Sequence, residues 1–472
     1  MFKYSKKALE KMNQLDESLR AKVENELKTY NGIVGEDIIN NILEKISESP
    51  SKIVVNKPSS FIPLAKEYSP NYNIDHRKDV TGKSRTESNI KDFLKFFRNR
   101  FERISRLFPL EVDSYERAHV EDIKHSTNRK VKIIAMVYDK MKTKKGNLLL
   151  KIEDLTGMGI AIVVSSNLHF QDFMENVLLD DIIMLYGTIR NNFLIVDDIR
   201  YPPISKPNSE PPSWDVGITY ISDVHIGSSF FLKDVFKRFI DWLSGKYGQK
   251  EVVSKIKYLV IGGDLVDGIG IFPNQEETLN VKDIYKQYEI FNEYMELIPD
   301  YITIFAIPGN HDAVRRGEPS PSLKEFLTDR VISLGNPSFI EIENITHLLY
   351  HGTSLDSIIG AIPRLSYEKP EDAMYELLKR RHLSPIYGTN PIVPEHVDYL
   401  VVDKLPDVFL AGHVHKNGFK SIRNILLLNA GTFQSITPFQ IKMGHIPTPG
   451  NVFTYFPLHR KLISKEFLNE KL

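Results

Sequence analysis

The sequence predicts a multi-domain protein in which a small helical region, a β-barrel and an α/β domain follow one another along the chain. Three observations support this prediction. The chain has 472 residues, which is enough for two or three domains. Five strand-like segments, separated by turns, lie within residues 131–196. Beyond residue 214, five short apolar runs each lead into a polar stretch that contains Asp or His.

The overall composition is that of an ordinary globular chain. Hydrophobic residues make up 42%, and 61 basic residues balance 61 acidic ones, so any nucleic-acid-binding surface has to be local. The absence of cysteine excludes disulfides and thiolate metal sites. The sequence has no run of about 18 apolar residues. We therefore expect no membrane partner and predict a cytoplasmic location.

Residues 1–46 are predicted to form a small helical region, which we interpret as either a helical cap or a partner-binding element. One amphipathic helix is expected over residues 1–30 and a shorter one near 39–46. The first helix is predicted from apolar residues at three- and four-residue steps, namely Met12, Leu15, Leu19, Val23 and Leu27. Residues 47–89 are rich in Ser, Pro, Asn and Lys, a composition that buries little apolar surface, so they are predicted to be a flexible linker.

Residues 90–200 are predicted to form a helix followed by an oligonucleotide-binding (OB)-like barrel. The helix, over residues 90–108, has an apolar face of Ile90, Phe93, Phe97, Phe101, Ile104 and Phe108. Strands are expected at 131–137, 148–154, 160–164, 182–189 and 193–196, with a helix at 170–178. About five strands with a helix after the third are typical of an OB barrel. Few aromatic residues lie on these strands, which favours protein docking over base stacking.

Residues 201–213 contain five prolines and are predicted to be a semi-rigid connector. The α/β domain then covers residues 214–472. Its apolar runs are rich in β-branched residues and end at Gly or Pro, as buried strands do. The polar stretches that follow them are Asp223-Val-His225, Gly263-Asp264, Gly309-Asn310-His311-Asp312, His351-Gly352 and Gly412-His413-Val414-His415.

These five polar stretches together predict a metal site. Side chains at the carboxyl ends of neighbouring strands converge on one edge of a sheet. A pair of divalent metals needs a bridging carboxylate and a mixture of nitrogen and oxygen ligands, which two Asp, one Asn and several His residues supply. Each stretch alone has a simpler interpretation, since Asp-x-His is common and Gly-Asp is often only a turn. The five together, in this order, favour a metal-dependent phosphodiester-cleaving site.

With these motifs the chain resembles the calcineurin-like metallophosphoesterases, and among them the exonuclease (small) subunits of archaeal D-family DNA polymerases. The resemblance covers roughly residues 90–472. Its most specific part runs from Gly263 to Gly270 and from Asp283 to Glu289. It implies an α/β domain of two packed β-sheets flanked by helices. The protein phosphatases of this superfamily differ, because they carry Arg where Gly268 stands and Glu where Asp312 stands.

The resemblance also implies a role for each residue. Asp223, His225 and His415 would bind one metal, Asp264 would bridge both metals, and Asn310, His351 and His413 would complete the second. His311 would donate a proton to the leaving oxygen, with Asp312 orienting its imidazole and Asp267 supporting the ligands. His347 is a nearby alternative to His351, although the Gly after His351 fits the family pattern better.

The expected activity is hydrolysis of phosphodiester bonds at DNA 3′ ends, with two divalent metals as cofactors. Mn²⁺ is the expected metal because a mixed site suits it better than Mg²⁺, although zinc and iron also accept imidazole. The expected partners are the large polymerase subunit, DNA and, through the complex, the sliding clamp. Two alternatives stay open: a non-catalytic scaffold subunit of the polymerase, and a phosphomonoesterase.

Overall fold

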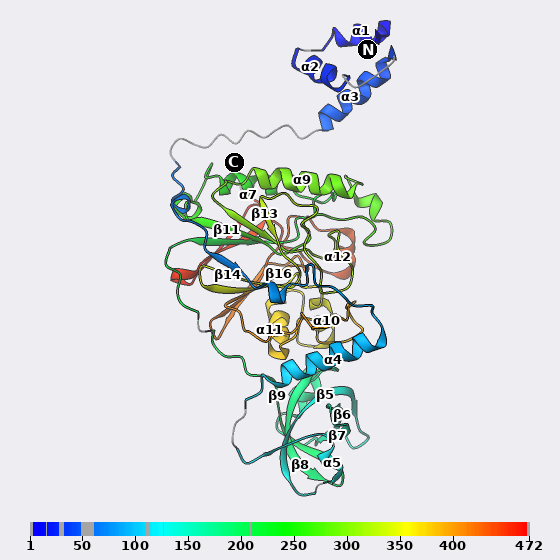
Figure 1. Ribbon diagram of the computed structural model, residues 1–472, viewed down its shortest axis with the longest axis vertical. Helices are drawn as coiled ribbons and strands as arrows, with labels where there is room; N and C mark the ends of the chain where they lie inside the picture. Colours follow the sequence, from blue (N-terminus) through cyan, green and yellow to red (C-terminus); the bar gives the residue numbers. More distant parts are fainter. Residues whose placement is uncertain are drawn as a thin grey trace. The chain divides into compact units, whose positions relative to one another are not determined.

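The computed structural model describes residues 3–15, 17–27, 33–48, 61–109, 113–125, 127–207 and 209–469. The chain divides into two compact units, residues 1–56 and 57–472 (Figure 1). The first unit contains three helices and a two-stranded parallel sheet: β1 (Lys3–Tyr4), α1 (Lys6–Met12), α2 (Glu17–Glu26), β2 (Ile33–Val34) and α3 (Glu36–Glu48). Its core consists of Ala8, Met12, Val23, Leu27, Val34 and Ile39. The predicted small helical region is confirmed.

The prediction of one continuous helix over residues 1–30 is wrong. The first helix ends at its C-cap Asn13, and α2 starts only at Glu17. Met12, Val23 and Leu27 are nevertheless buried, as the apolar spacing indicated. The break lets α1 and α2 each pack against α3. Because the three- and four-residue spacing continues across the break, the sequence pattern alone resembled a single helix.

The second unit begins with β3 (Tyr72–Ile74) and α4 (Ile90–Ser105), followed by a five-stranded barrel. The five barrel strands are β5 (Lys130–Lys142), β6 (Leu148–Glu153), β7 (Met158–Val163), β8 (Ile182–Arg190) and β9 (Phe193–Arg200). The short strand β4 (Glu116–Ala118) pairs in parallel with β5, and the domain also contains the helices α5 (Asp122–His125) and α6 (Phe170–Asn176). The strand order β5-β6-β7-β9-β8 closes through pairing of β8 with β5. Alternate residues of β5, from Val131 to Val137, point into the barrel core. The predicted OB-like barrel, with its helix after the third long strand, is confirmed.

The α/β domain has two six-stranded sheets. The first has the order β13-β12-β11-β10-β19-β20 and the second β17-β18-β16-β15-β14-β3. The first sheet contains β10 (Gly217–Ile221), β11 (Ile256–Ile261), β12 (Thr303–Ala306), β13 (Val331–Ser333), β19 (Asn451–Phe456) and β20 (Lys461–Glu466). Besides β3, the second contains β14 (Ser338–Ile342), β15 (Ile345–Leu349), β16 (Val408–Ala411), β17 (Gly418–Ile422) and β18 (Ile425–Asn429).

Helices cover the outer faces of the two sheets, as the family resemblance implied. The helices of the domain are α7 (Lys233–Leu243), α8 (Lys250–Val253), α9 (Ile284–Glu296), α10 (Leu355–Ala361), α11 (Pro370–Arg380) and α12 (Pro438–Met443), of which α12 leaves its apolar residues exposed. In Figure 1, α7 and α9 lie beyond the first sheet and α10 and α11 beyond the second. Residues such as Tyr220, Phe305 and Leu410 fill the space between the sheets. This four-layer arrangement fixes the strand ends that carry the polar motifs.

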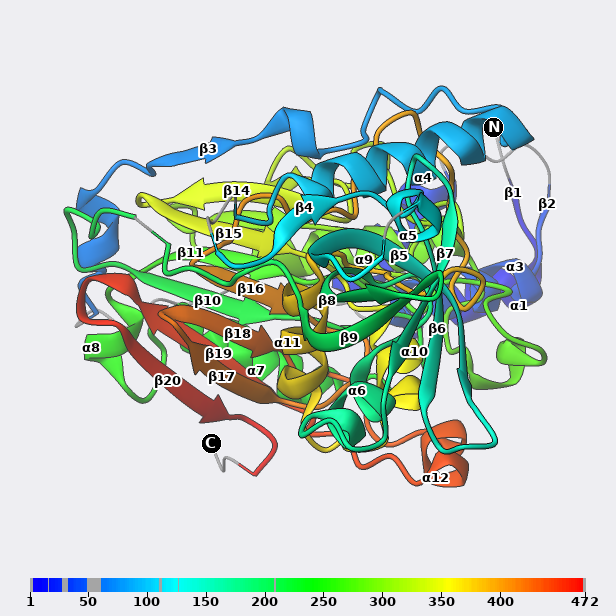
Figure 2. The same cartoon turned by 90° about the horizontal axis from the view of Figure 1, so that it is seen from below.

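The expectation of a flexible linker over residues 47–89 is wrong for residues 61–89. In this segment β3 pairs with β14, as Figure 2 shows. Ala65 is fully buried, and its N–H donates a hydrogen bond to the carbonyl oxygen of Ser254. The carboxylate of Asp79 accepts a hydrogen bond from the N–H of Gly335. A composition poor in apolar residues cannot form a core alone, but it can complete a sheet edge that another domain provides. Residues 49–60 lie outside the described residues.

Helix α4 packs through a face that only partly matches the predicted one. Ile104 and Phe108 are buried as predicted, but Ile90 is 80% exposed, and Phe96 and Arg100, outside the predicted face, are buried. Arg100 lies 2.7 Å from the carboxylate of Asp398 in the α/β domain. The helix therefore uses a buried ion pair, which apolar periodicity does not reveal.

Candidate metal centre

The predicted ligands all follow strands that point toward one region of the α/β domain. Asp223 and His225 come after β10, Asp264 comes after β11, and Asn310 comes after β12. These three strands are parallel neighbours in the first sheet. The other three come from the second sheet, with His351 after β15, and His413 and His415 after β16. The site therefore lies where the strand ends of both sheets meet.

One group of donor atoms contains Asp223, His225 and His415. Nε2 of His415 lies 3.3 Å from Oδ1 of Asp223, and Nε2 of His225 lies 3.8 Å from the same oxygen. The two imidazole nitrogens are 3.0 Å apart. All three residues are buried. These are the residues expected to bind the first metal.

A second group surrounds Asn310. Its Oδ1 lies 3.0 Å from Nε2 of His351 and 2.9 Å from Nδ1 of His413. Asp264 lies next to both groups, since its Oδ2 is 3.3 Å from Nε2 of His351 and 3.7 Å from Nε2 of His225. Asp264 is thus positioned as a bridging ligand would be. The structure brings together all seven residues that the sequence predicts as ligands.

Further hydrogen bonds fix which nitrogen of each imidazole faces the centre. Nδ1 of His351 lies 2.9 Å from the carbonyl oxygen of Gly262, which can only accept, so Nδ1 carries the proton. Nδ1 of His225 lies 2.9 Å from the carboxylate of Asp267, in the supporting role expected of that residue. Such outer contacts orient metal-binding imidazoles. They leave the Nε2 atoms of both rings directed inward.

The backbone at these positions is strained. The φ angles are positive at Asp223 (53°), His225 (54°), Asp264 (50°), His413 (70°) and His415 (55°). Such residues persist only where their surroundings hold them, and they cluster at functional sites. Glycine is needed beside them, because a Cβ at Gly309 would lie 2.1 Å from Oδ1 of Asp264. The sharp turns and the glycines of the motifs therefore both allow the predicted ligands to lie close together.

His311 lies at the edge of this centre. Its backbone N–H donates to Oδ1 of Asp264 at 2.8 Å, and its Nδ1 lies 2.8 Å from the backbone carbonyl oxygen of Asp267. Its side chain is 18% exposed, so the remaining ring nitrogen is within reach of a substrate. The expectation that the carboxylate of Asp312 orients this imidazole by direct contact is wrong. The carboxylate of Asp312 instead accepts hydrogen bonds from the backbone N–H of Gly309 and the hydroxyl of Tyr288.

Buried carboxylates and imidazoles shift one another's pKa values at the centre. Burial disfavours the carboxylate form of Asp264, yet the nearby imidazoles of His351 and His311 hold its pKa below the usual value. Burial likewise disfavours a charged His351, but the carboxylates of Asp264 and Asp223 raise the pKa of His351 to about 10. A site that raises the pKa of a buried imidazole in this way favours cations.

His347, the alternative to His351, is not part of the centre. It lies within β15, fully buried, with Nε2 2.8 Å from the hydroxyl of Tyr220 and Nδ1 2.8 Å from the carbonyl oxygen of Ile345. Both ring nitrogens are therefore occupied, and His351 is the histidine that faces Asp264.

Comparison with known proteins identifies the family. The calcineurin-like phosphoesterase family model matches residues 217–417, a range that includes every predicted ligand. The chain is 38% identical over 388 residues to the DNA polymerase II small subunit of Archaeoglobus fulgidus, covering 80% of this chain and 78% of that protein. The chain belongs to the DNA polymerase II small-subunit family.

Two further members of this family support the assignment. The DNA polymerase II small subunit of Methanocaldococcus jannaschii is 40% identical, over 82% of this chain and 67% of its own length. That of Methanothermobacter thermautotrophicus is 35% identical, over 86% and 84%. The predicted resemblance to archaeal polymerase small subunits is confirmed. Among solved structures, a novel archaeal phosphodiesterase aligns with 53% of this chain and 99% of its own at 15% identity, with a TM-score of only 0.29.

The donor set of this small-subunit family member fits divalent metals. Oδ1 of Asn310 lies at hydrogen-bond distance from Nε2 of His351 and Nδ1 of His413. An amide oxygen and imidazole nitrogens that converge in this way are ligand types that divalent metals accept. Among the described residues, no Lys or Arg forms an ion pair with a predicted ligand. The three sets of Asp and His side chains that could each hold a metal ion all include Asp223 or Asp264.

Several supporting residues of the small subunit were missed by sequence analysis. Asp356 lies 3.0 Å from Nε2 of His413, and the side-chain amide of Gln440 lies 2.9 Å from Nδ1 of His415. Gln434 contacts Asp267 at 3.1 Å. None of them belongs to a repeated motif, so no sequence signal pointed to them.

No helix among the described residues is long and apolar enough to cross a membrane.

Proposed function

We propose that this chain is the proofreading 3′→5′ exonuclease subunit of an archaeal replicative DNA polymerase, acting in the cytoplasm and supporting the large polymerase subunit. The single observation that supports this most is the convergence of seven donor residues, five of them buried, beside a partly exposed histidine, His311. Membership of the DNA polymerase II small-subunit family provides the polymerase context.

In this proposal Asp223, His225 and His415 hold one metal, Asn310, His351 and His413 hold the other, and Asp264 bridges them. Two divalent metals, Mn²⁺ in our proposal, would activate water and neutralise charge on the scissile phosphate. His311 donates a proton to the departing 3′ oxygen of the DNA chain, so that a bare alkoxide is not expelled. The contact of its Nδ1 with the carbonyl of Asp267 orients the ring for this role.

Two other functions fit less well. A scaffold without catalytic activity would not need every donor, nor the backbone strain at five of them. A phosphomonoesterase binds a phosphate group with two negative charges and would need a cationic side chain beside the metals. Gly268 stands where related phosphatases carry such a side chain, an Arg. Neither alternative has an observation of its own in its favour.

The proposal is tested with 3′-labelled DNA and a phosphomonoester, each incubated with the protein alone and with its large subunit. We expect nucleotide release from DNA that chelator abolishes and added Mn²⁺ restores. Phosphate release from the monoester alone would favour the phosphomonoesterase. Absence of both products in the assembled complex would favour the scaffold.

Partners belong to the same proposal. We propose that the large subunit docks on the OB-like barrel and the adjacent face of the α/β domain. The 3′ end of the DNA enters the metal centre. The sliding clamp contacts this chain only through the complex.

A further inference from the structure

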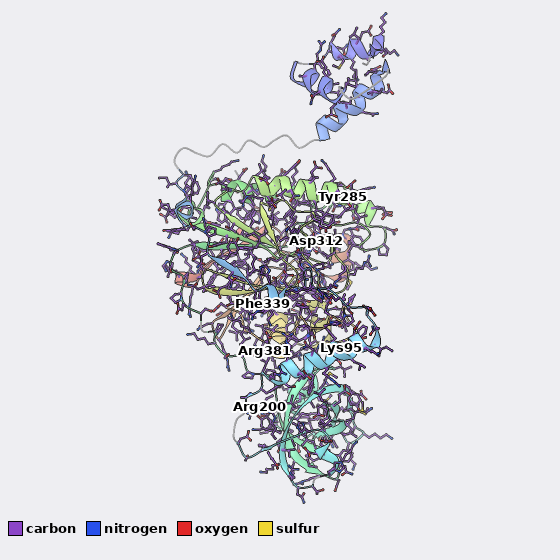
Figure 3. All side chains as sticks on the ribbon, viewed as in Figure 1. Lys95, Arg200, Tyr285, Asp312, Phe339 and Arg381 are labelled. Carbon is purple, nitrogen blue, oxygen red and sulfur yellow. The ribbon has the colours of Figure 1, made fainter. Side chains whose placement is uncertain are left out.

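The sequence segment from Asp283 to Glu289, the most specific part of the family resemblance, contributes no predicted metal ligand. In the structure it forms the start of α9, with Asp283 as the N-cap whose side chain accepts the N–H of Lys286. Two residues of this segment, Gln287 and Tyr288, are buried against the loops that carry the ligands. Figure 3 shows Asp312 between α9 and the rest of the domain.

The hydroxyl of Tyr288 makes two hydrogen bonds to the third motif. It donates to Oδ1 of Asp312 at 3.0 Å and accepts the backbone N–H of Ala313 at 2.9 Å. These are the two residues that directly follow His311. Asp312 in turn accepts the N–H of Gly309 at 2.8 Å and that of Leu265 at 3.2 Å. One hydroxyl therefore ties α9 to the loops that carry both Asp264 and His311.

Gln287 fixes the other side of the same histidine. Its Oε1 accepts the N–H of Gly268 at 2.9 Å, and its Nε2 donates to the carbonyl of Gly268 at 3.2 Å. Gly268 follows Asp267, whose carbonyl oxygen accepts from Nδ1 of His311. The imidazole is thus held by two loops, and each loop is anchored by a neighbouring residue of α9.

We infer that Tyr288 is a positioning residue for His311, acting through Asp312 and Ala313. This inference rests on the proposed function, because it assigns Tyr288 to the proton donor of that reaction. Tyr288 does not contact the predicted ligands. Its removal should therefore affect the placement of the proton donor and leave metal binding unchanged. Proton donation depends on hydrogen-bond geometry, so a small displacement of the ring lowers the rate.

The decisive variant is Tyr288→Phe, which keeps the ring and removes only the hydroxyl. Its rate is compared with wild type on DNA and on two thymidine 5′-phosphate esters, one with a phenyl and one with a p-nitrophenyl leaving group. A p-nitrophenolate leaves without a proton, so a displaced donor should cost nothing there. We expect kcat to fall roughly tenfold or more on DNA and on the phenyl ester, with KM, metal content and the p-nitrophenyl rate unchanged.

A second measurement does not depend on activity. The N–H of Ala313 loses its acceptor in Tyr288→Phe, so amide hydrogen exchange over residues 309–315 should become faster. Tyr294→Phe is the matched control. It lies on α9 and is buried, and its hydroxyl forms no hydrogen bond with the part of the chain that the structure describes. We expect it to leave both exchange and all three rates unchanged.

The outcomes separate the two proposals. An equal loss on all three substrates, or a loss of metal, would make Tyr288 a structural residue and overturn the inference. Unchanged rates with unchanged exchange would also overturn it. If wild type cleaves the esters but not DNA, the exonuclease proposal fails, while a leaving-group-dependent loss in the variant would still uphold the role of Tyr288. A wild type inactive on every substrate overturns both.

Discussion

Single residues at the metal centre combine backbone strain with buried charge. Each of the five non-glycine residues with positive φ costs on the order of 1–3 kcal/mol relative to relaxed backbone. Two buried carboxylates, Asp223 and Asp264, also lie close together within this centre. A bound cation offsets both costs, so the residue-level energetics favour the metal-loaded state over the empty one.

Asp264→Ala should abolish metal binding and exonuclease activity together, because this carboxylate lies beside the donors of both predicted metals. Metal content measured by elemental analysis and the rate of nucleotide release check the prediction. Asp329→Ala, an exposed position, serves as the control. A variant that keeps both metals and full activity would rule out the bridging role.

His311→Ala should lower kcat by roughly 10²–10⁴-fold, the usual contribution of a positioned general acid, while both metals stay bound. His119→Ala on the barrel, where the side chain is 66% exposed, is the control and should be unaffected. His225, Asp264 and His311 also form one of the possible metal-binding clusters. Loss of metal along with activity would therefore reassign His311 as a ligand.

The burial of His347 predicts that the stability of the protein depends on pH. Burial lowers the pKa of His347 to about 4 in the folded protein, whereas the pKa of its imidazole in the unfolded chain is about 6.5. A depressed folded pKa contributes stability that is fully present above pH 6.5 and is lost as pH falls toward 4. Between about pH 7 and 4.5 the wild type should lose about 2 to 3 kcal/mol more unfolding free energy than His347→Gln. Equal losses in denaturant titrations would contradict this.

At the level of elements, a buried ion network joins the barrel to the α/β domain. Arg380 of α11 lies 2.8 Å from the carboxylate of Asp181 in the barrel and also pairs with Glu376. All three side chains are buried. When one partner of a buried ion pair is removed, the remaining buried charge is uncompensated and the folded protein is destabilised.

Arg380→Met should therefore destabilise the protein by about 3–5 kcal/mol, because it removes the ion-pair partner of the buried Asp181 and leaves Glu376 with only Arg364 and Lys379. Chemical denaturation followed by circular dichroism measures the change. Replacing Asp181 and Glu376 with Leu in the same chain should recover much of the loss. A single variant as stable as wild type would show that solvent reaches this interface.

At the level of the whole molecule, the division at residue 56 sets the boundary for truncation. A chain of residues 57–472 should fold and still co-purify with the large subunit, because the first unit has a separate core. A chain of residues 90–472 lacks β3 and Ala65 and should melt at a lower temperature. Retention of the large subunit by residues 1–56 alone would instead move the docking site to the N-terminal helices.

The sequence predicted the fold class, and the convergence of the proposed ligands, for a physical reason. Buried strands followed by Asp, Asn or His produce a local pattern, and Asp223, His351 and His415 could be named as candidates from it. Contacts that depend on tertiary folding leave no such pattern. The role of Asp312, the pairing of Arg100 with Asp398, and the use of Gln287 and Tyr288 all join residues far apart in sequence, and each was missed or misassigned.

The pairing of β3 with β14 has a consequence for solubility. Without its three residues, β14 would become the outermost strand of the second sheet and present unpaired N–H and C=O groups to other molecules. Exposed strands of this kind recruit strands from neighbouring chains and promote aggregation. A short outer strand such as Tyr72–Ile74 gives little surface for such recruitment. The first strand of the second unit thus protects the edge of its sheet, and removal of residues 57–89 should make the remaining chain more prone to self-association.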